Sequence, residues 1–285
     1  MTYIAPPVNT LADFQIEYNG LLMGNGTPYY LPPNGSWAFF DMAAVKTMDQ
    51  ARTWGDGSWS GPDFSDVALP SVDFHVDAAD PVTFANLVTA FWQAFSPQAT
   101  GQPLWVKLPN MPVRGVAAKP HKRVLPATNI WSTHAEGALQ WRCPDPAWQS
   151  ASRSLVLTGG SAGASGMTFP LFAAVFDVLD FGTTGVASAS GTLTNAGNSP
   201  AWPVVVITQP GSIIIDGFTV TYAQAIPAGQ TVTIDYKAGT ATLTGDIDRT
   251  TQLTVRQFSP VTSTSSVFFS AASGTATLTV ADIWR

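Results

Sequence analysis

Three side chains that could bind a metal ion lie close together in the segment Val72–Asp77, which reads VDFHVD. The alternation of apolar and polar residues predicts a β-strand, with Asp73, His75 and Asp77 on the face away from the core. Alternate residues of a strand are about 7 Å apart, so a metal ion could use all three only with further ligands. No second histidine-rich segment supplies such ligands. We therefore interpret the three side chains as solvent-facing and expect no metal site.

A second group, Asp246 and Asp248, follows Gly245 near a turn. Two carboxylates can act as the acid and base of a glycosidase when they face each other across a cleft, and acidic turns can also bind calcium. Nothing in the sequence indicates that these two residues line a cleft, so we interpret them as exposed acids.

The single cysteine, Cys143, lies between Arg142 and Pro144 without a neighbouring histidine. It is typical of a buried structural thiol rather than a nucleophile.

The signatures of common catalytic sites are missing from the sequence. No Gly-x-Ser-x-Gly elbow, His-Glu-x-x-His pair or zinc-finger spacing occurs. The glycine-rich run 159–163 is not followed by the Gly-Lys-Ser/Thr of a phosphate-binding loop. We expect a protein that is not an enzyme and needs no cofactor.

The composition indicates a surface that other molecules cover. Charged residues make up 11% of the chain, against roughly 25% in a typical soluble domain, while 45% of the residues are hydrophobic. Such a surface is typical of an assembly subunit, although a secreted β-protein would share it. The net charge of −6 argues against non-specific nucleic-acid binding. No apolar run reaches the roughly 18 residues of a membrane-spanning helix.

Positive charge is concentrated in residues 101–125, which contain no acidic residue. Its charged members are Lys107, Arg114, Lys119, Lys122 and Arg123. These side chains could belong to a solvated loop or make an electrostatic contact with an acidic neighbouring subunit.

The elements expected to carry these residues are mostly β-strands. Asn19-Gly20 predicts a hairpin turn. Asp80 and Pro81 predict the start of one helix, which Ser96-Pro97 would end. Its apolar stripe suits packing on a sheet and consists of Phe84, Leu87, Val88, Phe91, Trp92 and Phe95. The segment Trp54–Asp63, rich in glycine and aromatic residues, is typical of a flexible loop or hairpin tip.

Small residues in 149–168 favour a domain boundary there. We expect an N-terminal domain over 1–150, a flexible connection over 151–168 and a β-sandwich over 169–285. Short strands are predicted over Phe169–Phe181 and between Gly191 and Trp284, because β-branched and aromatic runs alternate with Asn-, Pro- and Gly-containing turns.

Several segments resemble one family. Thr194–Asn198 (TNAGN), Pro200–Pro203 (PAWP) and Ile226–Asp235 (IPAGQTVTID) are similar to the C-terminal domain of distal tail proteins, the Dit-like minor tail proteins of long-tailed bacteriophages. Leu104–Pro109, followed by Arg114 and Pro120 and then by Leu139–Trp148, resembles the end of the family's N-terminal ring domain. Together these matches span about residues 100–245.

The resemblance implies a mostly β protein. Its N-terminal ring-forming domain would be a β-sandwich or split barrel with one α-helix, followed by a galectin-like, jelly-roll β-sandwich. It implies a structural protein of the virion, made in the bacterial cytoplasm, that forms a homohexameric ring at the tail tip. The ring would connect the tail-tube protein to the baseplate hub, admit the tape-measure protein and support receptor-binding or side-fibre proteins. With the charge and apolar-run arguments above, we expect no sequence-specific nucleic-acid binding and no membrane insertion.

The resemblance also suggests contact residues. In Dit-like proteins the region that matches Trp54–Asp63 crosses to neighbouring subunits, so Trp54 and Trp59 become candidate interface anchors. Candidates from the basic segment are Lys107, Arg114, Lys122 and Arg123.

Two other functions stay open at this point. A carbohydrate-binding sandwich for host cell-wall sugar would use exposed aromatic rings, for which Trp202, Tyr222 and Tyr236 are candidates. A cell-wall hydrolase would need catalytic residues that the sequence does not identify.

Overall fold

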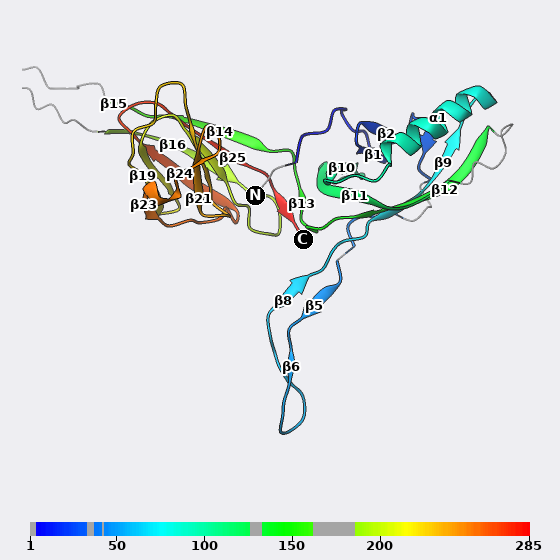
Figure 1. Cartoon of the computed structure of the whole chain (residues 1–285), viewed down its shortest axis with the longest axis horizontal. Coiled ribbons are helices and arrows are strands. Elements are labelled where there is room, and N and C mark those ends of the chain that lie inside the picture. Colours follow the sequence, from blue (N-terminus) through cyan, green and yellow to red (C-terminus); the bar gives the residue numbers. More distant parts are fainter. Residues whose placement is uncertain (1–3, 33–36, 42, 126–132, 162–185) are drawn as a thin grey trace, which may run out of the picture. The chain divides into compact units, whose positions relative to one another are not determined.

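The computed structural model describes residues 4–32, 37–41, 43–125, 133–161 and 186–285. The chain divides into two compact units. The N-terminal unit comprises Tyr3–Ala151 with Trp284–Arg285, and the C-terminal unit comprises Ser152–Ile283. Strands dominate both units, and α1 is the single α-helix of the described residues, so the expected mostly β fold is confirmed (Figure 1).

The N-terminal unit is built on one antiparallel sheet that curves into a nearly closed barrel. The two outer strands of its main path, β2 and β3, lie against each other. In spatial order the path is β2 (Leu21–Gly24), β1 (Gln15–Tyr18), β10 (Gln102–Lys107), β11 (Arg114–Val124), β12 (His134–Arg142), β9 (Ser71–Asp77) and β3 (Tyr29–Tyr30). Off this path, β4 (Trp37–Ala38) pairs with β9, and β13 (Trp148–Gln149) pairs with β11 and with β26 (Ile283–Trp284).

Local sequence explains the first hairpin of this sheet. Asn19 and Gly20 have φ angles of 48° and 79°, which suit a tight turn between antiparallel strands and favour these two residue types. The turn sets the register of β1 on β2, with Tyr18 opposite Leu21. The predicted Asn-Gly hairpin is therefore present.

The helix α1 (Pro81–Ala94) covers the sheet and begins as the sequence predicts. Asp80 caps it, because its Oδ1 accepts hydrogen bonds from the backbone N–H groups of Val82 and Thr83, both at 2.9 Å. The helix contributes buried side chains to the core, but Trp92, which we expected in the apolar stripe, is 45% exposed.

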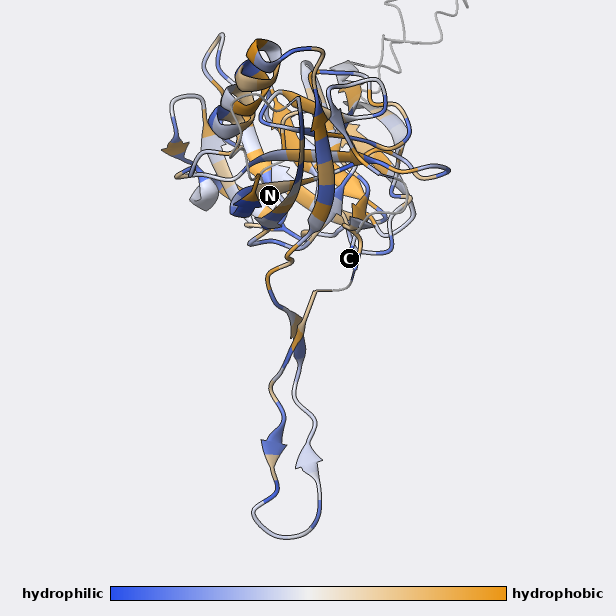
Figure 2. Ribbon diagram, turned by 90° about the vertical axis from the view of Figure 1, so that its right-hand side faces the viewer, coloured by the Kyte–Doolittle hydropathy of each residue, from blue (hydrophilic) through white to orange (hydrophobic). Residues whose placement is uncertain are grey.

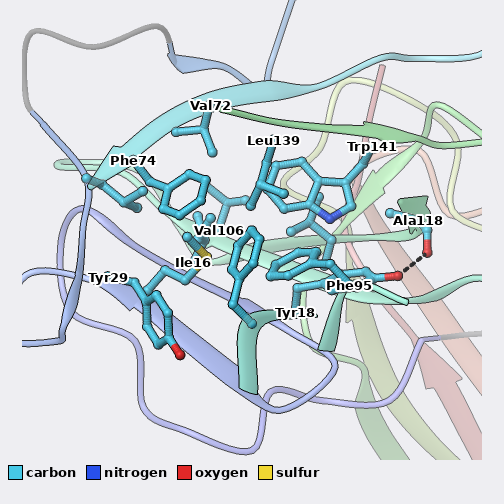
Figure 3. Close-up of a cluster of buried hydrophobic side chains, with 14 of the residues drawn as sticks. Ile16, Tyr18, Tyr29, Val72, Phe74, Phe95, Val106, Ala118, Leu139 and Trp141 are labelled. Carbon is cyan, nitrogen blue, oxygen red and sulfur yellow. Dashed lines mark hydrogen bonds between the residues drawn. The ribbon is translucent and has the colours of Figure 1, made fainter. Parts of the chain in front are cut away.

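Aromatic rings fill the core between α1 and the sheet (Figure 3). Phe95 stacks on Tyr18 with 5.1 Å between ring centroids, and it also contacts Phe91 and Trp141. The buried Tyr18 hydroxyl donates a hydrogen bond to the carbonyl oxygen of Ala118 at 3.3 Å, so its polar atom is satisfied away from water.

The C-terminal unit is a sandwich of two six-stranded antiparallel sheets. The first has the order β14 (Arg153–Thr158), β25 (Thr275–Val280), β17 (Val204–Ile207), β20 (Val232–Asp235), β21 (Thr240–Leu243) and β22 (Ile247–Asp248). The second has the order β15 (Gly160–Ser161), β16 (Val186–Thr194), β24 (Thr264–Ser270), β18 (Gly211–Ile215), β19 (Phe218–Tyr222) and β23 (Leu253–Arg256). A short 3₁₀ turn, Thr250–Gln252, precedes β23.

Burial alternates along the strands of both sheets, as a sandwich requires. In β25 the buried residues are Ala276, Leu278 and Val280, and in β24 Val267 and Phe269 alternate with exposed neighbours.

Part of the expected connection over 151–168 is regular structure. Residues Arg153–Thr158 form β14, which pairs over its full length with β25, and Leu155 and Leu157 lie next to Gly191 of the opposite sheet. Residues 162–168 and the strands expected over Phe169–Phe181 lie outside the described residues.

Candidate assembly surfaces

A long β-hairpin, here called the arm and comprising residues 44–65, extends from the N-terminal unit (Figure 1). Two short ladders hold it together. β5 (Val45–Thr47) pairs with β8 (Asp63–Ser65), and β6 (Gln50–Ala51) pairs with β7 (Ser58–Trp59). Every arm residue is exposed except the half-buried Gly61, so the arm has no core of its own.

The arm carries large apolar side chains that face solvent, and Figure 2 shows orange, hydrophobic segments along it. These side chains are Val45, Met48, Trp54, Trp59 and Phe64. Trp54 at the tip is 90% exposed and Trp59 is 65% exposed. Exposed apolar clusters of this kind mark interaction sites, and tryptophan is among the residues enriched at binding hot spots.

Few polar contacts stabilise the arm internally. Asp49 Oδ1 accepts a hydrogen bond from the backbone N–H of Gly61 at 2.9 Å, and the guanidinium of Arg52 lies 4.9 Å from the Trp59 ring centroid. At the base of the arm, Lys46 forms an ion pair with Asp66 at 2.8 Å. The hydrogen bond from Lys46 lowers the pKa of Asp66. An isolated two-stranded hairpin is marginally stable in water, so this geometry suits a segment that gains order from a binding partner.

A pocket of ≈ 220 Å³ lies where the arm joins the sheet. Its lining includes Phe39, Ala68 and Leu69, and Asp41 is its single titratable side chain among the described residues. A lone exposed carboxylate beside apolar side chains offers no acid–base pair for catalysis.

Most cations of the basic segment are already bonded within the N-terminal unit. The Lys107 ammonium donates hydrogen bonds to the carbonyl oxygens of Met111 and Leu108 and pairs with Asp13 at 3.0 Å. Lys119 donates to the carbonyl oxygen of Ala99.

Arg123 has a structural role at the end of α1. Its Nη1 donates to the carbonyl oxygens of Trp92 and Phe95, at 2.7 and 3.1 Å. Trp92 lies in the last turn of the helix and Phe95 is its C-cap, so the positive charge lies at the helix C-terminus, where it is favourable. Lys122, in contrast, is exposed and keeps its ammonium group available for an acidic partner.

Arg114 lies between two aromatic rings. Its guanidinium carbon is 4.2 Å from the Trp284 ring centroid and 5.1 Å from that of Phe40. Burial lowers the pKa of this guanidinium, and its buried Nε has no hydrogen-bond partner among the described residues. Arg114 thus binds the C-terminal Trp284 to the sheet by cation–π contacts. As interface residues, Lys107, Arg114 and Arg123 remain predictions, while the contacts here give each of them an internal role.

Two of the three candidate sugar-binding residues are buried. Tyr222 and Tyr236 are 1% and 2% exposed, because both fall on the inward face of the sandwich, and Tyr236 packs edge-on against Phe258. A buried ring cannot stack on a sugar. Trp202 is half-buried.

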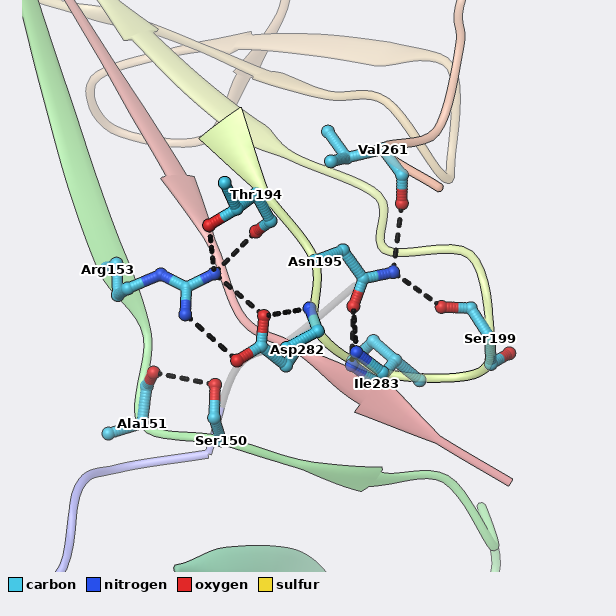
Figure 4. A network of polar contacts seen from close by, with 11 residues as sticks. Ser150, Ala151, Arg153, Thr194, Asn195, Ser199, Val261, Asp282 and Ile283 are labelled. Carbon is cyan, nitrogen blue, oxygen red and sulfur yellow. Dashed lines mark hydrogen bonds and ion pairs between the residues drawn. The ribbon is translucent and has the colours of Figure 1, made fainter. Parts of the chain in front are cut away.

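The TNAGN motif of the C-terminal unit holds neighbouring segments of that unit together by hydrogen bonds (Figure 4). The Asn195 amide donates to the carbonyl oxygens of Ser199 and Val261, and its Oδ1 accepts from the N–H groups of Gly197 and Ile283. Beside it, the nearly buried Asp282 accepts two hydrogen bonds from the Arg153 guanidinium, at 2.7 and 2.9 Å.

The remaining reactive groups do not form a catalytic constellation among the described residues. Cys143 is fully buried, and burial raises the pKa of its thiol to about 12, which leaves it protonated and unreactive at neutral pH. Hydrogen bonds from the side chain and from the backbone N–H of Thr250, the latter at 2.8 Å, lower the pKa of the Asp248 carboxyl.

One group of described side chains could hold a metal ion: His75, His134 and Glu136. His75 lies on the outer face of β9 with Asp73 and Asp77, as the alternation predicted, and the other two residues come from β12. None of the helices among the described residues is long and apolar enough to cross a membrane.

No protein-family model matches this chain, and no curated protein matches its sequence. Among solved structures it is similar to the Dit protein (gp 19.1) of phage SPP1, described as a paradigm of the hub adsorption apparatus in phages that infect Gram-positive bacteria. The TM-score is 0.60 at 10% sequence identity, over 95% of this chain and 99% of that chain. Two structures of the phage P2 baseplate in its activated conformation, one with Ca and one with Sr, give TM-scores of 0.48 and 0.47 at 7% and 6% identity. These alignments cover 94% and 93% of this chain and 97% and 96% of the matched chains. From its likeness to SPP1 Dit, the chain has the Dit fold over nearly its whole length.

Proposed function

We propose that this chain is a structural protein of a phage tail, and that copies of it form a ring at the distal end of the tail tube. The arm carries the proposal, because it exposes Trp54 and Trp59 on a hairpin that has no core of its own. The shared fold with SPP1 Dit supports the same role.

In this proposal the arm of each subunit packs on the next subunit. Burial of the two tryptophans would supply the anchor residues that dominate protein interfaces. Head-to-tail contacts that close by rotation produce a ring, and six subunits are the number that the resemblance implies. The low share of charged residues, 11% of the chain, suits a surface that other subunits cover.

The ring would connect the tail-tube protein to the baseplate hub, and the tape-measure protein would pass through its lumen. The galectin-like C-terminal sandwich would support receptor-binding or side-fibre proteins at the tail tip of the virion. No bond is made or broken in this role, and the buried, protonated thiol of Cys143 supports it. A carbohydrate-binding function is not proposed, because Tyr222 and Tyr236 are buried.

A phage that lacks this gene, complemented with variants of the protein, tests the role. Immunogold labelling of purified particles should place the wild-type protein at the tail tip. Trp54→Ser and Trp59→Ser, singly and together, should reduce its incorporation into particles, with the double variant about tenfold or more below wild type. Phe218→Ser, which removes a 49% exposed ring from the C-terminal unit, is the matched control.

Two results would contradict the proposal separately. Particles without label would overturn the tail role itself. Label at the tail tip together with normal incorporation of the double variant would keep the tail role and reject the arm as the assembly contact.

A further inference from the structure

Pairing of β9 with β12 brings together two histidines that are far apart in the sequence. The register places Glu136 opposite His75 and His134 opposite Asp77. All four side chains lie on the outer face of the sheet, and the histidine and glutamate ligand atoms lie within 4.8 Å of one another. The group is half-exposed: the side chains of His75 and His134 are 30% and 50% accessible, so a metal ion could reach it.

The separations suit a small metal ion. Glu136 Oε1 lies 4.0 Å from His75 Nδ1 and 3.8 Å from His134 Nε2. Zinc bonds of about 2.0–2.1 Å in tetrahedral geometry place neighbouring ligand atoms about 3.3 Å apart. The two glutamate separations are close to this value, and all three ligand atoms lie within 4.8 Å of one another, so small rotations of these half-exposed side chains would bring them to one ion.

A fourth side chain orients one of the ligands. The Asp77 carboxylate lies 2.6 Å from Nδ1 of His134. An Nδ1–H that donates to this carboxylate leaves Nε2 unprotonated and directed at Glu136. Histidines that bind metals in proteins commonly make such a hydrogen bond to a carboxylate through their other ring nitrogen, which fixes the tautomer and makes the ligating nitrogen more basic.

We propose that His75, His134 and Glu136 form a binding site for a divalent transition metal of the zinc type, with Asp77 as the positioning residue. Two imidazoles and one carboxylate favour zinc, nickel or copper over calcium and magnesium, which take oxygen ligands. Three protein ligands leave the fourth position to water, and the bound ion links the side chains of the paired strands β9 and β12 on the outer face of the sheet.

Metal titration of the untagged full-length chain at pH 7.5 tests the site. Isothermal titration with zinc should show one ion per chain. Cobalt(II), used as a spectroscopic substitute, should give the visible absorption bands of a four-coordinate ion, and zinc should remove them. Circular dichroism without metal checks that each variant is folded.

The chain offers a matched control, because His121 is its third histidine and lies exposed on β11. His75→Ala, His134→Ala and Glu136→Gln should each weaken zinc binding about tenfold or more, and Asp77→Asn should weaken it roughly tenfold. His121→Ala should bind as wild type. Equal binding by wild type, His75→Ala and Glu136→Gln would overturn the proposal, as would the absence of one-to-one binding by wild type.

Discussion

At the scale of single residues, Asn195 shows how a turn motif can fix a fold. Its amide group bonds four backbone groups, and it is 6% exposed. The bonds join the TNAGN turn to Val261 and to Ile283 near the C-terminus. Each bond has modest net value, but a buried group that loses its partner costs about 1–3 kcal/mol.

Asn195→Ala should therefore lower the free energy of unfolding of the C-terminal unit by about 2 kcal/mol. Denaturant unfolding followed by circular dichroism measures this change. Gln224→Ala, which removes an exposed amide of the same unit, is the control and should leave stability unchanged. A loss in Asn195→Ala no larger than in the control would show that the backbone groups find other partners.

Residue types alone could not identify the contacts of several side chains. Tyr222 and Tyr236 alternate with polar residues in the same way whether they face the core or solvent, so only the packed sandwich distinguishes the two. The sequence did not indicate the proposed metal site, because the pairing of β12 with β9 brings His134 and Glu136 next to His75. Residues so far apart in the chain have no characteristic spacing. The one available signal was a second alternating strand, His134–Arg142, that carries polar residues on one face.

At the scale of elements, the sequence predicted the pieces that depend on local rules. The β1–β2 hairpin follows from Asn19-Gly20, and α1 follows from Asp80 and Pro81. The arm was predicted only as a loop or hairpin tip, because its paired segments are two or three residues long and show no apolar alternation. A strand pair that buries neither face needs no alternation of apolar and polar residues, so hydrophobic periodicity does not identify it.

The cap of α1 makes stability depend on pH. Hydrogen bonds from Thr83 and Val82 lower the pKa of Asp80, so the carboxylate stabilises the folded state at neutral pH. This stabilisation is present above the ordinary carboxyl pKa of about 3.9 and is lost as the pH falls through the lowered value. Asp80→Asn should therefore melt below wild type at pH 7, and the two proteins should converge at pH 2–3. Thermal melts at both pH values measure this, and a difference that persists unchanged in acid would contradict it.

At the scale of the whole molecule, two units each bury their own core. The N-terminal unit packs aromatic rings between α1 and the barrel, whereas the C-terminal unit packs mainly aliphatic side chains between two sheets, with Tyr222, Tyr236 and Phe269 among them. The resemblance implied a mostly β chain, and short β-branched and aromatic runs separated by turns predicted the sandwich. The curvature of the first sheet into a barrel depends on which distant strands pair, which the sequence does not state.

A core mutation in one unit should therefore affect one unfolding transition. Leu278→Ala, at a fully buried position of β25, should destabilise the C-terminal unit by about 2–4 kcal/mol. Differential scanning calorimetry should show the transition of that unit at lower temperature and the other unchanged. Equal shifts of both transitions would indicate that the units unfold together.

The length of the arm determines how far from the N-terminal unit it can make a contact. An extended strand advances roughly 3.3 Å per residue, so the run from residue 44 to residue 54 spans roughly 35 Å. A compact body of the size of the N-terminal unit has a radius of gyration of roughly 15 Å. The tip can thus touch a molecule well beyond the surface from which the arm departs, and shortening the hairpin by a few residue pairs would change which molecule it can touch while both cores stay intact.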